Sequence, residues 1–463
     1  MVVVSTGPEA SVHTRMRLDT QVENGENQGT RQPSRPGIVI LALAILYPAF
    51  MIQFGVNYSR ISNIDFPSFW CAAQAAFEHG TSPYAREYLQ TLLPAQKVFP
   101  LVPEMKEFPY QMFIYPQETE LPAQHVFPFL HAPPSLLAFF PLSLFSYEAA
   151  RKGFLVLNHL LLLFLMYFVP IKLLGLKARK HALLLILGAA YTFSFYPLVV
   201  LLNHGQVNLV LAAALCLFWF WVREDKPILA SLALVFSILL KTYPAVLLLF
   251  LVLCRKFRAF VLSSLLLFAA LTLSLLVLPE MLWEQWLGSI LPTGGYASTP
   301  LGLFSPAAVW NQSLNGFLSR IFTESQWSPN PLVDSPMIAR TLCYLGALSL
   351  LAASSWAVLQ RYRRDSETAF DWAMLLFFPL MFLIAPLAWE HHLVYVLVTA
   401  AALLIAALQS WDQNVRLTGL TVLSVLVLAT QGLLAFKFYA VLALWALALE
   451  RALSSEEGLV EGS

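Results

Sequence analysis

Residues 228–253 read ILASLALVFSILLKTYPAVLLLFLVL, and this stretch decides how the chain is arranged. The run is apolar except at residues 241–244 (KTYP), where a lysine and a proline interrupt it. Because proline ends a helix, the run predicts two short helices that meet at a polar apex. At membrane depth the charge of Lys241 costs about 2.5–3.5 kcal/mol, so it needs a partner or an anionic ligand. The alternative is a lysine side chain that extends to the membrane interface.

The composition of the whole chain agrees with a membrane location. Of its 463 residues, 58% are hydrophobic and 12% are charged, which is about half the charged fraction of a soluble domain. We therefore predict an all-α polytopic membrane protein. A net charge of +1, with no basic face and no glycine-rich phosphate loop, excludes nucleic acid as a partner. The four cysteines are scattered, so we expect neither a disulfide framework nor a zinc site.

Hydrophobic runs outside residues 228–253 predict the other membrane spans. They lie near residues 38–54, 153–171, 182–202, 206–222, 258–278, 341–360, 370–388, 392–409, 416–432 and 434–450. With residues 228–253 crossing twice, the chain has about twelve transmembrane helices and both termini in the cytoplasm. Residues 131–147 are short for a crossing, which takes ~20 residues, and we expect them to be re-entrant. A full span there would instead reverse the sides assigned to residues 171–227.

The chain divides into a disordered cytoplasmic tail at residues 1–35, a transmembrane domain at 36–452 and a second cytoplasmic tail at 453–463. Two long loops, residues 55–130 and 279–340, are expected on the outer face. This arrangement places four basic segments inside, as the positive-inside rule requires. They are residues 177–180, 223–226, 255–258 and 361–364.

Asp65 lies at the start of the first outer loop, within residues 63–70 (NIDFPSFW). A carboxylate just beyond a membrane exit can act as a base toward a lipid-borne substrate, although an ordinary solvated loop aspartate would occupy the same place. Residues 66–80 carry apolar side chains at helical spacing and predict a helix on the membrane face. Gly80 and Pro83 are expected to end it.

Other polar residues fall at the same outer face, and each has a structural as well as a functional explanation. Gln206 and Asn208 either cap helix ends or hydrogen-bond to sugar hydroxyls. His391 and His392 either lie in an interfacial belt, or recognise phosphate as imidazolium, or act as a second acid or base. His131 has the same alternatives. A metal shared by the adjacent histidines is the weaker explanation, since neighbouring helical residues point about 100° apart.

Taken in order along the chain, these motifs resemble glycosyltransferase family 87. The pattern consists of Asp65 followed by residues 80–84 (GTSPY), 131–134 (HAPP), 205–208 (GQVN), 241–244 (KTYP) with 255–258 (RKFR), 311–313 (NQS) and 389–392 (WEHH). That family contains bacterial polyprenol-phosphate-mannose-dependent α-mannosyltransferases. The resemblance therefore implies their C-type membrane glycosyltransferase fold.

The resemblance also implies a reaction. A sugar, most simply mannose, would move from a polyprenyl-phosphate donor to an acceptor hydroxyl, with inversion, on the outer face of the bacterial inner (plasma) membrane. The acceptor would be lipid-linked or a glycan, and membrane lipids are the remaining partners. In such enzymes an aspartate in the first outer loop is the usual base, and Asp65 is the matching position. Since that loop has no DxD motif, we expect no metal or other cofactor.

The chemistry of an inverting transfer assigns roles to the other candidates. Lys241 and an imidazolium at His392 or His391 would stabilise the departing donor phosphate, with Arg320 as a further phosphate ligand. Contacts to the sugar or acceptor are expected from His131, Gln206, Asn208, Asn311, Gln312, Tyr84 and Trp70.

A transporter or lipid flippase is the alternative function, with a polar path lined by Lys241 and the histidines. Against it, residues 228–254 have no internal repeat in the other half of the chain. Polar residues also crowd one membrane face instead of scattering through many spans. A ligase or polymerase of lipid-linked sugars would need a basic outer loop, whereas residues 55–130 are mixed in charge.

Overall fold

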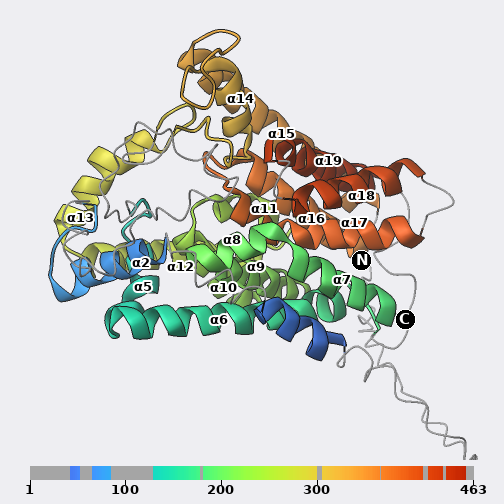
Figure 1. Cartoon of the computed structure of the whole chain (residues 1–463), viewed down its shortest axis with the longest axis horizontal. Coiled ribbons are helices and arrows are strands. Elements are labelled where there is room, and N and C mark those ends of the chain that lie inside the picture. Colours follow the sequence, from blue (N-terminus) through green and yellow to red (C-terminus); the bar gives the residue numbers. More distant parts are fainter. Residues whose placement is uncertain are drawn as a thin grey trace, which may run out of the picture.

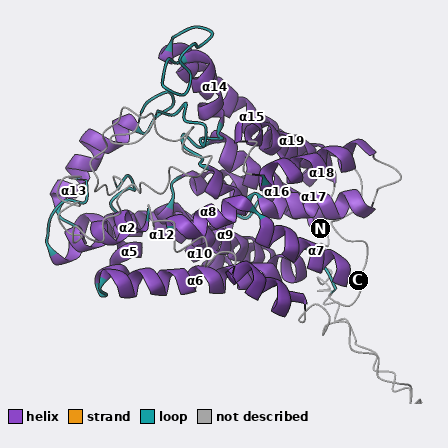
Figure 2. Ribbon diagram, viewed as in Figure 1, coloured by secondary structure: helices purple, strands orange, loops and turns teal. Residues whose placement is uncertain are grey.

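The computed structural model describes residues 42–52, 65–84, 129–177, 181–299, 305–364, 366–409, 415–430 and 434–454. Within these ranges every regular element is a helix, as Figure 2 shows, so the predicted all-α class is confirmed. Both predicted tails and most of the first outer loop lie outside the described residues. Their predicted character therefore remains a prediction.

The first part of the chain forms several helical elements within the described residues. They are Ala42–Ile52, α2 (Phe66–Ala73) with its π-helical end η1 (Gln74–Glu78), α5 (Ser135–Ser143), and α6 (Tyr147–Phe168) continued by η3 (Val169–Leu173). The prediction of a helix after Asp65 is confirmed, and it ends before Gly80. The nine residues of α5 extend over about 14 Å, roughly half a hydrocarbon core, which agrees with a re-entrant segment.

The predicted span at residues 182–202 is broken into two helices. They are α7 (Ala182–Ser194) and α8 (Tyr196–His204), and they meet at an angle of 51°. Phe195 between them is extended and precedes Pro197 near the start of α8, so the backbone cannot continue as one straight helix. The break directs the end of α8 toward Asp65.

Helix α9 (Asn208–Arg223) leads to the stretch that organises the fold. Here α10 (Pro227–Leu240) ends before Lys241, and the chain continues as η4 (Tyr243–Ala245) and α11 (Val246–Leu253). The predicted break at residues 241–244 is therefore confirmed. Lys256, just after α11, lies over the ring of Phe370, and the next residue, Asp371, pairs with Arg223 before α10. The chain thus runs out to the apex and returns to the end from which it started.

The remaining helices follow α11 along the chain. They are α12 (Phe257–Val277), α13 (Glu280–Gln285), η5 (Trp286–Ile290), η6 (Leu291–Thr293), α14 (Leu314–Phe322), α15 (Pro336–Arg364), α16 (Ser366–Ile384), η7 (Glu390–Tyr395), α17 (Leu397–Gln409), α18 (Val415–Ala429) and α19 (Leu434–Leu453). In Figure 1, α15–α19 pack against one another at the upper right, with α14 at the top.

Several described helices are suited to a membrane. Three are long and apolar enough to cross one, namely Tyr147–Leu173, Phe257–Val277 and Pro336–Arg363, and the bent pair α7–α8 could supply a fourth span. Large apolar side chains on α12, such as Leu276 with 79% exposure, have no cover within the described protein and suit contact with lipid. These features fit an integral membrane protein, while the number of about twelve spans remains a prediction.

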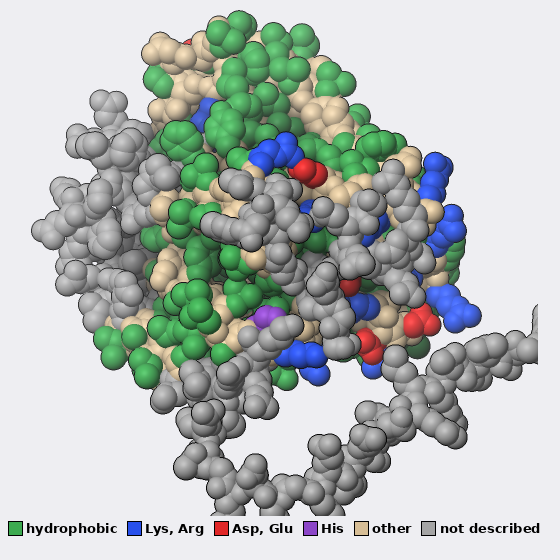
Figure 3. Space-filling view, turned by 90° about the vertical axis from the view of Figure 1, so that its right-hand side faces the viewer, with side chains coloured by type: hydrophobic (Ala, Val, Ile, Leu, Met, Phe, Trp, Pro, Cys, Tyr) green, Lys and Arg blue, Asp and Glu red, His purple; other side chains and the backbone are tan. Residues whose placement is uncertain are grey.

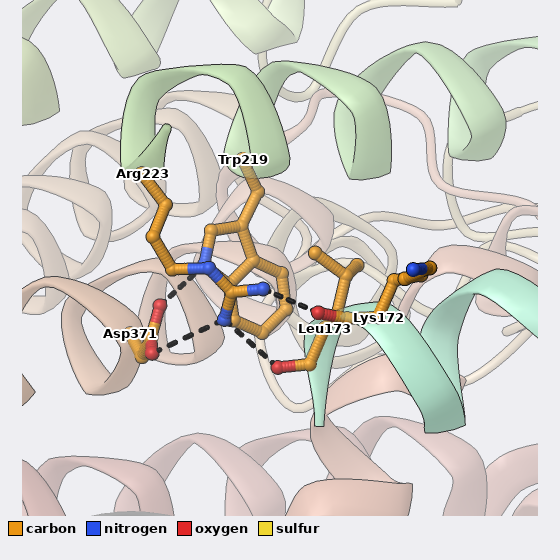
Figure 4. Close-up of polar contacts among 5 residues, drawn as sticks. All are labelled: Lys172, Leu173, Trp219, Arg223 and Asp371. Atoms are coloured by element: carbon orange, nitrogen blue, oxygen red, sulfur yellow. Dashed lines mark hydrogen bonds and ion pairs between the residues drawn. The ribbon is translucent and has the colours of Figure 1, made fainter. Parts of the chain in front are cut away.

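Arg223, from one of the predicted basic segments, lies in a polar cluster (Figure 4). Arg223 pairs with Asp371 at 3.4 Å and donates to the carbonyl oxygen of Leu173 at 2.9 Å. The indole Nε1 of Trp219 donates to the Asp371 carboxylate at 2.6 Å. The cluster fastens η3, α9 and α16 together. Figure 3 shows the right-hand side of Figure 1 face on, and Lys and Arg side chains are visible at several places on this face.

Candidate active site

Asp65 and His204 form the centre of the site. The amide of Asp65 donates to the carbonyl oxygen of His204 at 3.0 Å, and the Nδ1 atom of His204 lies 3.3 Å from the Asp65 carboxylate. His204 is the last residue of α8, and Gly205 follows with φ +66°. Glycine adopts this left-handed conformation without a steric penalty, so the chain can turn sharply and bring Gln206 back toward Asp65.

The surroundings of Asp65 favour its ionised form. Burial raises the pKa of the carboxyl, but a hydrogen bond and positive charge from His204, together with a hydrogen bond from Gln206, lower this pKa by more than burial raises it. The pKa of Asp65 therefore lies below its ordinary value of 3.8. At neutral pH this residue is a partly buried carboxylate, able to accept a proton.

A row of three imidazole rings extends from Asp65 toward the apex at Lys241. The ring centroids of His204 and His391 are 5.5 Å apart, and those of His391 and His392 are 4.7 Å apart. The ring of His392 lies 6.3 Å from that of Tyr243, a residue of the apex. The row therefore connects α8, η7 and η4.

His391 and His392 are neutral in this setting. Burial holds the pKa of both rings well below the ordinary value of 6.5, and the positive charge of Lys241 lowers both further. The imidazolium expected from the sequence is therefore a neutral imidazole in the free protein. Each such ring still offers one N–H donor.

Lys241 and His131 lie near both Asp65 and His392. The Nδ1 atom of His131 is 2.7 Å from the carbonyl oxygen of Leu240, which fixes the ring beside the apex. Burial lowers the pKa of Lys241 to about 8, while the Asp65 carboxylate acts in the opposite direction. Burial and the Lys241 charge lower the pKa of His131 to about 3, so at pH 7 the lysine is the cation and the histidine is neutral.

Several buried polar atoms around this centre have no hydrogen-bond partner among the described residues. They are Oδ1 of Asn203, Oε1 of Gln206, both amide atoms of Asn208, Nε2 of His391 and both ring nitrogens of His392. Buried polar groups in proteins are normally paired, so a concentration of free donors and acceptors needs a polar ligand. A sugar with several hydroxyl groups meets that requirement.

Three predicted ligands are instead bound to the protein itself. Arg320 donates to the carbonyl oxygens of Ala308 and Asn311 at 3.1 and 3.0 Å. Asn311 accepts from the amide of Ala388 at 3.1 Å, and Gln312 accepts from the amide of Phe438 at 3.0 Å. These contacts hold the segment before η7, and the structure does not bring them into the centre at Asp65.

Trp70 and Tyr84 also have protein partners. The indole of Trp70 donates to the carbonyl oxygen of Phe145 at 3.1 Å. The hydroxyl of Tyr84 donates to the carbonyl oxygen of His131 at 2.9 Å. Both side chains are 9% exposed, so neither presents an open face to a sugar ring. Tyr84 instead fixes the backbone of His131.

Two contributors were not among the predicted site residues. His204 lies two residues before Gln206, a predicted site residue. This position in the sequence was the signal that could have identified it. Lys437 pairs with Glu390 at 2.8 Å, and both side chains are buried. A lysine within an apolar helical run was the signal for that pair.

The described residues contain no group of three or more His, Cys, Asp or Glu side chains that could hold a metal ion. Independence from a metal remains a prediction.

Comparisons with known proteins identify the family of this chain. The model of glycosyltransferase family 87 matches residues 129–386, more than half of the chain. The matched part contains His131, His204 and Lys241 but neither Asp65 nor the histidine pair of η7. The polyprenol-phosphate-mannose-dependent alpha-(1-2)-phosphatidylinositol mannoside mannosyltransferase of Mycobacterium tuberculosis is 28% identical over 316 residues, which cover 65% of this chain and 67% of that protein. No solved structure gives a significant match.

Proposed function

This chain belongs to glycosyltransferase family 87 and is a membrane glycosyltransferase, and we propose that it transfers mannose from a polyprenyl-phosphate donor to an acceptor hydroxyl with inversion. The observation that carries the proposal is the Asp65 carboxylate, held at 3.3 Å by His204 and coupled to the Lys241 cation. The relative from Mycobacterium tuberculosis uses polyprenol-phosphate-mannose, which supports this donor. A lipid-linked acceptor is the simplest choice, since that relative's name gives a phosphatidylinositol mannoside.

The reaction is a single in-line displacement at the anomeric carbon. The acceptor oxygen forms the new bond to that carbon as Asp65 takes the hydroxyl proton. The bond between the anomeric carbon and the phosphate oxygen breaks, and its electron pair leaves with polyprenyl phosphate. Lys241 then neutralises the charge that develops on the phosphate.

The neutral donors around the base hold the substrates. His392 lies beside Tyr243 and next to the Lys241 charge, so its ring N–H suits an oxygen of the donor phosphate. Gln206 and Asn208 carry free amide atoms close to Asp65 and suit the sugar hydroxyls. Because these groups are buried, each hydrogen bond is made without competition from water.

The outer face of the membrane is the expected location of the chemistry. Helix α9 begins at Asn208 beside the site and ends at Arg223 in the basic cluster. Its 16 residues separate the two by about 24 Å, close to the thickness of a hydrocarbon core. If the basic end is cytoplasmic, as the positive-inside rule requires, the site faces outward.

The test uses purified protein in detergent or nanodiscs with a panel of radiolabelled polyprenyl-phosphate sugars. We expect transfer from the mannosyl donor, and its loss in Asp65→Asn. Glu78→Gln is the matched control, since Glu78 is an exposed carboxylate on the same segment and should retain native turnover. Absence of transfer from every donor, together with movement of lipid across vesicles, would establish the transporter instead.

A further inference from the structure

Lys437 and Glu390 form a buried ion pair close to the proposed site. The ammonium and carboxylate are 2.8 Å apart, and the side chains are 0% and 5% exposed. Lys437 lies in the first turn of α19, whereas Glu390 begins η7, directly before His391 and His392. The pair therefore joins the segment that carries both histidines to a helix far along the chain.

The lysine also contacts the helix that supplies His204. Its ammonium lies 5.7 Å from the ring centroid of Tyr196, the first residue of α8, in a cation–π arrangement. Helix α8 packs against η7, and His204 at its far end contacts His391. One cation thus touches both elements that deliver imidazole rings to the row beside Asp65.

Stability alone does not account for this pair. Removing two charges from water is costly, and a well-packed apolar pair of similar volume is often at least as stable. Ionisable residues inside membrane proteins are rare and mark functional places. A second, uncharged contact already fastens α19 here, because the amide of Phe438 donates to Gln312 at 3.0 Å. The charges therefore supply something other than attachment of the helix.

We propose that Lys437 is a positioning residue for the reaction, which rests on the proposed function. By holding the Glu390 carboxylate, it fixes the direction in which η7 leaves Trp389. That direction sets His391 against His204 and His392 against Tyr243. Lys437 itself touches no substrate.

The test is the double variant Lys437→Met/Glu390→Gln, which removes both charges and leaves neither partner buried alone. We expect native yield, a KM for the mannosyl donor within about threefold of native and a kcat lower by about 10- to 100-fold, because small misplacements of catalytic groups are that costly. The matched control is Arg223→Gln/Asp371→Asn, which removes the ion pair at the opposite end of α9. It should leave kcat unchanged.

A second measurement does not depend on activity. Diethyl pyrocarbonate modifies accessible imidazoles, and mass spectrometry gives the rate at each histidine, with exposed His79 as the internal reference. We expect His391 and His392 to react about fivefold faster in the double variant, because a loosened η7 opens more often. Native kcat or unchanged modification rates in that variant would overturn the positioning role. If the native chain transfers no sugar, the proposed function fails, and the modification rates still decide whether Lys437 fixes the histidines.

Discussion

Asp65 is tied to His204 twice, once through the backbone and once through the side chain. The amide of Asp65 donates to the His204 carbonyl oxygen at 3.0 Å, and the His204 ring reaches the Asp65 carboxylate at 3.3 Å. The first contact fixes where α2 begins relative to the end of α8. The second pairs the carboxylate with the His204 ring, so the position of Asp65 depends on the geometry of both helices.

Asp65→Asn should lower kcat by about 10²- to 10⁴-fold, the usual contribution of a general base. The amide has nearly the same shape, so the affinity for the polyprenyl-phosphate donor should stay close to native. Turnover and donor binding can be measured on the same preparation, by radiolabel transfer and by equilibrium dialysis in detergent. Near-native turnover in this variant would show that Asp65 is not the base.

His204→Ala should shift the acid limb of the pH profile. The His204 hydrogen bond and charge lower the pKa of Asp65, so removing them raises that pKa toward or above 3.8. As pH falls, the variant should lose kcat/KM at a higher pH than the native protein, because the base becomes protonated earlier. His79→Ala, at an exposed position, should keep the native profile. Coincident acid limbs for His204→Ala and the native protein would contradict the pairing.

Lys241→Arg should abolish the fall of kcat/KM at alkaline pH. Burial lowers the pKa of Lys241 to about 8, so the free protein loses this cation, and kcat/KM falls, as pH rises through that value. Arginine stays charged throughout, so its variant should show no decline near pH 8. Lys241→Ala should have a low kcat/KM at every pH. A profile that declines identically in the native and arginine proteins would exclude Lys241 as the titrating group.

Gly316→Ala should strongly lower the temperature at which the protein unfolds. A Cβ atom at this position would lie 2.1 Å from the carbonyl oxygen of Asn311, which is backbone and cannot move aside easily. The displaced segment also carries the Asn311 contact to Ala388, so the approach to η7 would shift with it. Gly419→Ala is the control, since its Cβ would meet nothing within 4 Å and alanine favours a helix by about 1 kcal/mol. Thermal unfolding in detergent should show a lower midpoint temperature for Gly316→Ala and a slightly higher one for Gly419→Ala.

Cysteine labelling tests the orientation in the membrane. All four native cysteines are buried, so an impermeant maleimide should leave the native protein unlabelled. Glu78→Cys, at the end of the helical segment that begins after Asp65, should react from outside intact cells, and Lys226→Cys, near the basic cluster, only after the cells are opened. Both substituted positions are exposed. Reaction from the opposite sides would place the site in the cytoplasm.

The sequence predicted the helices and their interruptions well, because these depend on local patterns. Hydrophobic length and a proline located the break at Lys241, and helical spacing located the helix after Asp65. The positive-inside rule grouped the basic segments, and the structure brings Arg223 and Lys256 to one end. The bend at Phe195 was not predicted, although Pro197 within the apolar run was a signal for it.

The partners of individual polar side chains were harder to predict. Polar residues in an outer loop look like ligand contacts, yet Arg320, Asn311 and Gln312 bind the protein's own backbone. The ion pair between Glu390 and Lys437 joins segments that are distant in the sequence, so no periodic pattern in the sequence predicts it. Sequence patterns indicated which polar residues to consider, while the pairing of their side chains required coordinates.

The location of Lys437 also sets a requirement on the order of synthesis. Asp65 and His204 leave the ribosome long before α19, and η7 is made in between. The ion pair with Glu390 can form only after α19 has been translated and inserted beside helices made earlier. A nascent chain that already contains the base, the lysine of the apex and all three imidazole rings therefore still lacks the fixed arrangement of η7. The chain therefore becomes able to transfer sugar only late, when α19 inserts beside the earlier helices.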